Sequence, residues 1–193
     1  VVQNLKIEGY TSREPLPFSE KKKGTYRLWQ PGEHWGDLFD CGWFHFTGTI
    51  PPETAGKHLA VLVDLSAEGL VVDQNGNPVQ GLTSATSRNE FPLGLWGKRT
   101  IELKDCLNEQ GQIDFWGDFT CMDIEGQYRN NGRIKEACLV WVDDPVRETF
   151  YDWVVCQSLF VGLCENGDAY GEEVGQLLER AASALGPEEA EHT

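Results

Sequence analysis

The stretch EGLVVDQNGNPVQGLT, residues 68–83, indicates the fold class most clearly. Two short apolar runs flank Asn75-Gly76, and an Asn-Gly pair supplies the two positive-φ residues that a type I′ turn requires. We therefore predict a β-hairpin whose strands are residues 69–73 and 78–83. Such a hairpin favours an antiparallel sheet over a parallel one, because antiparallel strands can be joined by a tight turn.

The same alternation of short apolar runs and turn residues extends from about residue 25 to 142. Gly, Pro and Asn separate these runs, which is typical of an all-β domain. We therefore predict an antiparallel β-sandwich of the jelly-roll, galactose-binding-domain-like type over residues 1–143, in which residues 1–25 form an N-terminal arm. The other predicted strands are residues 43–47, 58–65, 100–103, 113–116, 119–122 and 134–142.

The pattern changes to a helical one after Val142. Asp143-Asp144-Pro145 is typical of a helix start, with an acidic N-cap and Pro at the first helical position. Apolar residues then recur at spacings of three, four and seven, and a second apolar stripe covers residues 172–185. We predict that residues 144–193 form a helical linker that leads towards an absent catalytic domain. The alternative is that both helices fold back onto the sandwich.

Composition narrows the classes of function. The formal charge is −15, with 31 acidic and 16 basic residues, which argues against a nucleic-acid-binding surface. Eighteen consecutive apolar residues occur nowhere in the sequence, so no membrane span is expected. The N-terminus lacks the pattern of a signal peptide, and the six cysteines form no Cys-x-x-Cys motif. We expect a cytoplasmic protein with reduced, structural cysteines.

Residue types that serve in catalytic and metal sites are present, but their spacing in the sequence is not that of a known site. The four histidines, His34, His45, His58 and His192, have neither His nor Asp two positions away, so we predict no metal site. A further group of carboxylates is expected to form a solvated rim rather than a catalytic pair: Asp114, Asp118, Asp123 and Glu125. We therefore predict no catalytic residue in this chain.

Several motifs, in a fixed order, point to one family. Trp43-Phe44, Ile50-Pro51 and Gly56-Lys57 precede residues 68–83, and the segments 131–137 and 144–152 follow. This order resembles the N-terminal domain of cytosolic and vacuolar α-mannosidases of glycoside hydrolase family 38. Several linked motifs are more specific than any single one. The chain departs from the family at residues 71–76, where it lacks the Trp that the central hairpin often carries.

The resemblance implies a zinc-dependent retaining hydrolysis of α-mannosides by the parent polypeptide, with an Asp nucleophile and a second carboxylate as acid/base. The zinc ligands and nucleophile would lie beyond Thr193. This chain would then have no cofactor of its own, and its partner would be its own catalytic domain. The resemblance also implies a homo-oligomeric parent.

Three hypotheses for the role of the domain follow. In the first, it braces the catalytic domain and contributes to the substrate cleft or to a subunit interface, through Glu68, Gly69, Leu70, Gln80 and Gly81. In the second, it is a carbohydrate-binding module that takes mannosides by stacking on Trp35, Trp96, Trp116 and Tyr128. In the third, it is an interaction module unrelated to glycosidases.

Overall fold

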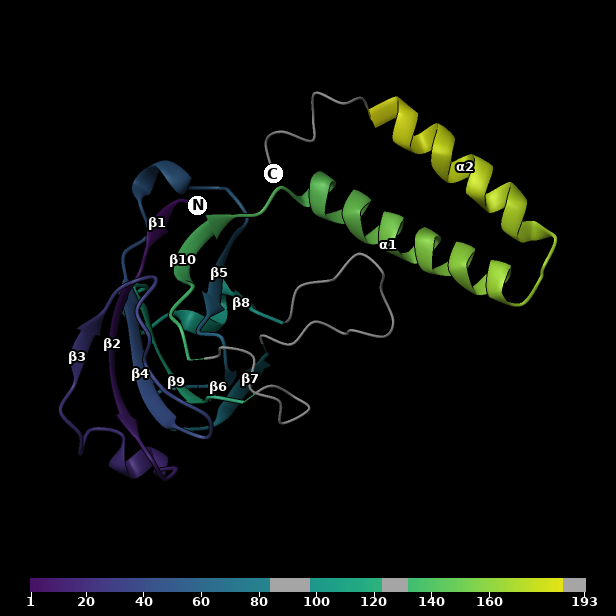
Figure 1. Cartoon of the computed structure of the whole chain (residues 1–193). Coiled ribbons are helices and arrows are strands. Elements are labelled where there is room, and N and C mark those ends of the chain that lie inside the picture. Colours follow the sequence, from purple (N-terminus) through teal and green to yellow (C-terminus); the bar gives the residue numbers. More distant parts are fainter. Residues whose placement is uncertain (84–97, 123–131, 186–193) are drawn as a thin grey trace. The chain divides into compact units, whose positions relative to one another are not determined.

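The computed structural model describes residues 1–83, 98–122 and 132–185. The chain divides into two compact units, Val1–Val142 and Asp143–Thr193. The first unit is built of strands and the second of helices (Figure 1). Each is described by itself below.

Two antiparallel sheets form the first unit, which confirms the predicted jelly-roll sandwich. The four-stranded sheet has the order β1 (Gln3–Asn4), β10 (Glu136–Trp141), β5 (Leu59–Asp64) and β8 (Thr100–Glu102). The six-stranded sheet has the order β3 (Arg27–Trp29), β2 (Lys6–Ser12), β4 (Cys41–Gly48), β9 (Ile113–Thr120), β6 (Glu68–Val72) and β7 (Pro78–Leu82). Short 3₁₀ turns occupy Phe18–Glu20, Pro52–Thr54 and Leu103–Cys106.

The main core lies between the two sheets, and both contribute to it. Because side chains alternate along a strand, each sheet turns every second residue inward. The six-stranded sheet contributes aromatic rings and the four-stranded sheet contributes β-branched and leucine side chains, among them Phe44, Phe46 and Phe119 from the first and Val61 and Leu139 from the second. All five are at most 1% exposed. At about 1.5–3 kcal/mol for each large apolar side chain that is fully buried, this core is the main source of stability.

Two phenylalanines at the centre of the six-stranded sheet pack over glycines. Strands β4 and β9 both carry the pattern Gly-x-Phe, and their register places Phe44 opposite Gly117 and Phe119 opposite Gly42. A methyl group added at either glycine would meet a phenylalanine ring: that of Phe44 for Gly42, and that of Phe119 for Gly117. The two rings meet edge to face with centroids 5.7 Å apart. These glycines are therefore required by packing.

The N-terminal segment is more than an arm. The sequence predicts an arm over residues 1–25, but β1 and β2 lie inside it, and β2 occupies an interior position between β3 and β4. The apolar residues of β2 are too few for its pattern to reveal a strand, since glycine and polar residues take the other positions. The rest of the segment covers the outer face of the six-stranded sheet, where Leu16, Phe18 and Tyr26 pack on Trp43, Val72 and Trp116.

Two other expectations are wrong in detail. The hairpin turn is not of type I′, because Gly76 has a positive φ of 87° whereas Asn75 does not. Instead the Asp73 carboxylate accepts the backbone N–H groups of Asn75 and Asn77, each over 2.8 Å. Residues 113–116 and 119–122 were expected as two strands, but β9 is a single strand that runs through Gly117. Glycine there provides room for the Phe119 ring and does not mark a turn.

The second unit is a pair of helices, α1 (Asp144–Glu165) and α2 (Tyr170–Leu185), which contact each other. The Asp143 side chain accepts a hydrogen bond from the backbone N–H of Val146, which confirms an acidic N-cap in the predicted segment but places Pro145 at the second helical position and not the first. Residues 143–193 carry 12 acidic and two basic side chains, so they hold −10 of the formal charge. In the described part of the chain, neither helix combines the length and apolarity needed to cross a membrane.

Candidate functional site

The five residues predicted at the hairpin divide between the two faces of the sheet. Leu70 lies opposite Gly81 on the outer face, and Leu70 is 38% exposed. Gln80 turns the other way and donates from Nε2 to the backbone oxygen of Thr100 over 2.6 Å, which links the two sheets. Glu68 accepts a hydrogen bond from Thr83 Oγ1 over 2.5 Å. Glu68, Leu70 and Gly81 therefore lie on the outer face, where the Glu68 carboxylate is bonded to Thr83, and Gly69 and Gln80 lie on the inner face.

The two hairpin glycines have different reasons to be glycine. A methyl group added at Gly69 would meet the Phe119 ring, so packing inside the sandwich excludes a side chain there. A methyl group added at Gly81 would meet nothing nearer than the Gly69 backbone oxygen at 4.0 Å. The φ of Gly81 lies outside the left-handed region, so the backbone does not require glycine either. Nothing inside the described domain explains Gly81.

An unpaired carboxylate lies beside Leu70 on the same face. Asp118 on β9 is the cross-strand neighbour of both Trp43 and Leu70. Its burial raises its pKa from 3.8 to about 6, and no group in the described part of the chain forms a hydrogen bond or ion pair with it. The expected solvated rim is therefore wrong for Asp118. The position of Asp118 depends on the register between β4, β9 and β6, and no local sequence pattern predicts that register.

The other carboxylates of the expected rim are placed differently. Asp114 Oδ1 accepts a hydrogen bond from His45 Nε2 over 2.8 Å, and the His45 ring stacks on Trp116 with centroids 4.2 Å apart. Asp123 and Glu125 lie outside the described residues. Both carboxylates lie on the outer face of β9; Asp114 is hydrogen-bonded to His45, whereas Asp118 has no partner among the described residues.

The aromatic residues predicted to stack on sugars are described in two cases out of four. Trp35 is 4% exposed, and its Nε1 donates to the backbone oxygen of Leu65 over 2.9 Å. Trp116 is 9% exposed beneath Tyr26 and His45. In this conformation neither ring offers a free face. Trp96 and Tyr128 lie outside the described residues, so sugar stacking by them stays a prediction.

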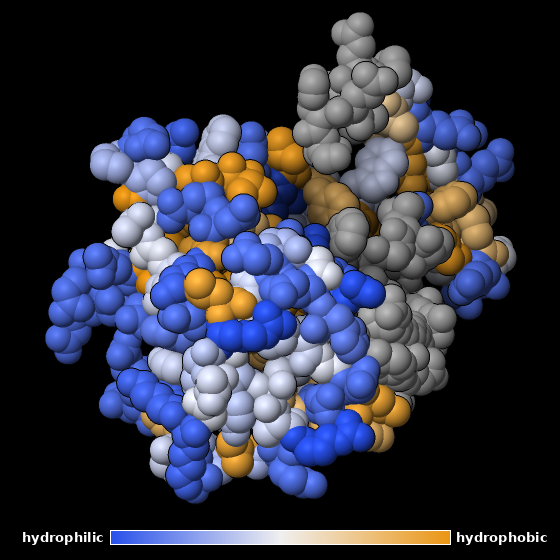
Figure 2. Space-filling view, turned by 60° about the vertical axis from the view of Figure 1, so that its left-hand side comes forward, coloured by the Kyte–Doolittle hydropathy of each residue, from blue (hydrophilic) through white to orange (hydrophobic). Residues whose placement is uncertain are grey.

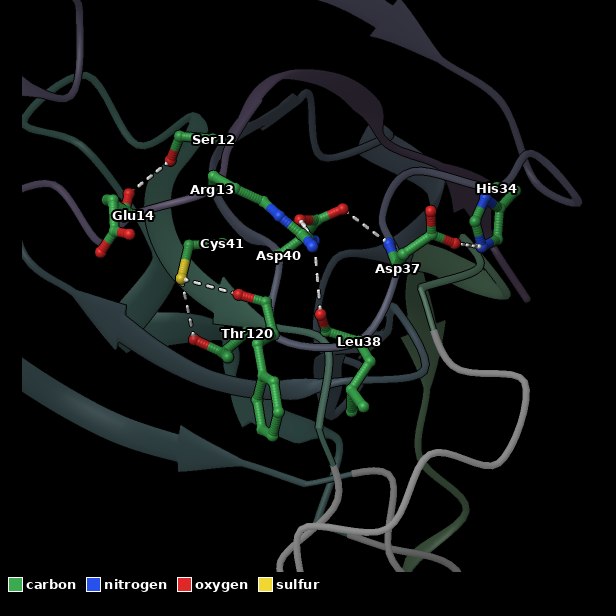
Figure 3. A network of polar contacts seen from close by, with 10 residues as sticks. Ser12, Arg13, Glu14, His34, Asp37, Leu38, Asp40, Cys41 and Thr120 are labelled. Atoms are coloured by element: carbon green, nitrogen blue, oxygen red, sulfur yellow. Dashed lines mark hydrogen bonds and ion pairs between the residues drawn. The ribbon is translucent and has the colours of Figure 1, made fainter.

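A polar network fixes the loop before β4, as Figure 3 shows. Arg13 donates to Asp40, whose other oxygen accepts the backbone N–H of Asp37 over 2.8 Å. Burial acts to raise the pKa of Asp40, but these hydrogen bonds lower it on balance. The network holds Phe39 with a φ of 67° and 55% exposed, and its backbone N–H donates to Cys121. No pattern in the sequence indicates this exposed ring.

Hydrophilic residues cover most of the face that Figure 2 shows, and hydrophobic residues gather there in small groups. Leu70 and Val79 are among the exposed apolar residues of the sandwich, at 38% and 37% exposed. Val79 lies where the β6–β7 register shifts and has no Cα partner. We call Leu70, Val79, Gly81 and Asp118 the hairpin face.

The comparison with known families identifies the domain. Residues 2–144 match a family model described as the jelly-roll domain of α-mannosidase. The chain belongs to the α-mannosidase jelly-roll domain family. The match ends within two residues of the boundary between the strand unit and the helical unit. No curated protein matched the sequence.

The α-mannosidase resemblance implies a zinc ion, and the described residues do not fit one. Among them, no group of three His, Cys, Asp or Glu side chains is placed to hold a metal. All six cysteines lie in the described part of the chain as free thiols. Burial raises the pKa of Cys106 and of Cys121 to about 12, so these thiols stay protonated and are poor nucleophiles. Cys156 and Cys164 are exposed, whereas the other four cysteines are buried.

Proposed function

We propose that this chain is the non-catalytic N-terminal domain of a family 38 α-mannosidase, and that it braces the catalytic domain through the hairpin face. The observation that carries the proposal is the combination of exposed Leu70 and Val79 with a glycine, Gly81, for which the described residues of the domain give no reason. A close backbone approach by another element is a common reason for glycine in a strand.

The chemistry of the hairpin face indicates what the other element carries. Apolar side chains on it would be covered on docking, and a cation would pair with Asp118. Pairing would return the Asp118 pKa towards its ordinary value, because a neighbouring positive charge favours the ionised carboxylate. A half-buried carboxylate that has no partner among the described residues lowers the stability of the domain, and such costs are typical of functional surfaces. We therefore expect a Lys or Arg flanked by apolar side chains on the catalytic domain.

The remaining parts of the proposal concern the whole protein. The helices α1 and α2 would lead the chain towards the catalytic domain, which would hold the zinc and the catalytic carboxylates. We propose a cytoplasmic location, where the six thiols would stay reduced. We also propose that the parent is a homo-oligomer.

The test uses this chain and the catalytic domain of the same polypeptide, produced separately and mixed in a calorimeter. We expect the double substitution Leu70→Asp, Val79→Asp to weaken association by about tenfold or more, because it places charge on a covered apolar surface. Leu28→Asp is the matched control: Leu28 is 53% exposed on β3, at the opposite edge of the same sheet. Equal binding by both variants and the wild type would remove the hairpin face from the proposal.

Activity is measured in parallel. The chain alone should not hydrolyse an aryl α-mannoside, with or without added zinc. Zinc-dependent turnover by the chain alone would overturn the non-catalytic role.

A further inference from the structure

A polar groove lies at the end of the sandwich where β9 begins, and it shares no residue with the hairpin face. Its volume is about 440 Å³, which falls within the usual range for small-molecule sites. It is formed where β1 passes into β2, where β4 ends, and where the loop of residues 107–112 enters β9. Eight of its ten lining residues carry polar or charged side chains.

Several of these side chains are held in place by the protein. Asn108 Oδ1 accepts the backbone N–H groups of Gln110 and Gln112, each over 3.0 Å, which leaves its NH₂ group to donate elsewhere. Gln3 donates from Nε2 to the backbone oxygen of Thr49, which leaves its Oε1 to accept. The groove thus has a fixed amide donor and a fixed amide acceptor that need no rearrangement to bind a ligand.

The Asp114 carboxylate is oriented in the same way. Its Oδ1 accepts from His45 Nε2 over 2.8 Å, and the His45 ring is held flat against Trp116. Its second oxygen has no hydrogen-bond partner among the residues described, so it can accept a hydrogen bond from a ligand in the groove. The His45 ring therefore links Asp114, which lines the groove, to the fluorescent ring of Trp116.

Other lining groups are free to bind. Within the described residues, the side chains of Asn4, Gln112 and Thr47 hydrogen-bond to no other protein group. Two of them are carboxamides, which both donate and accept, and the third is a hydroxyl. Such a set matches a ligand whose own groups both donate and accept, as the hydroxyls of a saccharide do.

The charge of the groove favours a neutral ligand. Lys6, which also pairs with Glu8 over 2.8 Å, and Asp114 are its two charged lining residues, and they have opposite sign. An anion would meet Asp114 and a cation would meet Lys6, each at an electrostatic cost. No aromatic ring is among the lining residues, so hydrogen bonding rather than stacking would determine affinity.

We propose that this groove binds a neutral saccharide through the carboxamides of Asn4, Asn108 and Gln112 and the free oxygen of Asp114. This site differs from the four aromatic residues that the sequence indicates for sugar stacking, and it does not depend on docking by the hairpin face. Because solvent-exposed hydrogen bonds each contribute little, the dissociation constant should be about millimolar.

The test is a titration of the ¹⁵N-labelled chain with methyl α-D-mannoside, followed by amide and side-chain NH₂ shifts. We expect saturable shifts at residues 3–6 and 107–114 and at the Trp116 indole. The double substitution Asn4→Ala, Gln112→Ala should raise the dissociation constant about tenfold. Gln110→Ala is the matched control, because Gln110 lies in the same turn but does not line the groove, and it should change binding by less than about twofold.

Two further titrations identify the ligand class. Methyl β-D-glucoside tests whether the groove distinguishes among neutral sugars, and binding of either glycoside supports the proposal. Inorganic phosphate tests the alternative of an anion site at Lys6. Saturable binding of phosphate with no binding of either glycoside overturns the proposal. So does the absence of any saturable shift, or shifts that the double substitution leaves unchanged while its amide spectrum shows a folded domain.

Discussion

Replacing Asp118 with Asn tests the electrostatics of the hairpin face directly. Asn has nearly the same shape as Asp but no charge, so Asp118→Asn removes the desolvation cost of a half-buried carboxylate. The Asp118 pKa of about 6 in the folded chain lies above its ordinary value of 3.8. The folded state therefore prefers the protonated carboxyl, and ionisation at neutral pH works against folding.

The magnitude and sign follow from linkage. A pKa of about 6 instead of 3.8 corresponds to at most about 3 kcal/mol at neutral pH, and partial solvent screening of this half-buried group reduces this to about 1–2 kcal/mol. Between about pH 4 and pH 6 the folded chain holds more protons than the unfolded chain. The free energy of unfolding should therefore decrease as the pH rises through this window. Asp118→Asn should be more stable than wild type at pH 7 and nearly equal to it at pH 4.

The assay is denaturant unfolding at a series of pH values between 4 and 7.5, followed by tryptophan fluorescence. Six of the seven tryptophans lie in residues 1–142, so the signal reports mainly on the sandwich. Glu109→Gln serves as control, because it removes an exposed carboxylate from the same unit. A constant difference between Asp118→Asn and wild type across the series, or a variant less stable at pH 7, would refute the reasoning.

Three other predictions concern packing and accessibility. Ellman's reagent should react rapidly with two thiols of the native chain, Cys156 and Cys164, and with all six in denaturant; more than two fast thiols would contradict the burial of the others. Gly69→Ala should lower the free energy of unfolding by about 2 kcal/mol because its methyl group meets the Phe119 ring, whereas Gly81→Ala should change it by less than about 0.5 kcal/mol. Amides of α1 and α2 should exchange faster than those of β5, since the helices bury few side chains; equal protection would show that the helices are as stably held as the sheet.

The sequence predicted most of the strands because alternation and turn residues are local signals. The hairpin of β6 and β7, the buried strand β5 and the acidic helix start at residues 143–145 all depend on neighbouring residues, and all are present. The strand β2 was not predicted because its own residues show no clear alternation of apolar and polar side chains. It is a strand because it pairs with β3 and β4. Gly117 misled for the reverse reason, since its role depends on Phe119 and not on a turn.

The candidate site was harder to predict than the fold. Leu70 and Gly81 came from the sequence, but Asp118 reaches them only through the pairing of β9 with β6. The polar groove collects residues from positions 3 to 6, 47 to 49 and 108 to 114, which no local pattern connects. The sequence also predicts a solvated position for Asp118, because its acidity says nothing of the strands that bury it.

The crossed pairs of glycine and phenylalanine on β4 and β9 constrain how this domain can evolve. A larger residue at Gly42 or Gly117 is tolerable only when a smaller residue replaces the phenylalanine that packs over it. That smaller residue alone would leave a void over both strands. Neither step is favourable alone, so relatives should change these positions jointly. The four residues Gly42, Phe44, Gly117 and Phe119 are therefore expected to covary, even though the pair on β4 and the pair on β9 lie far apart in the sequence.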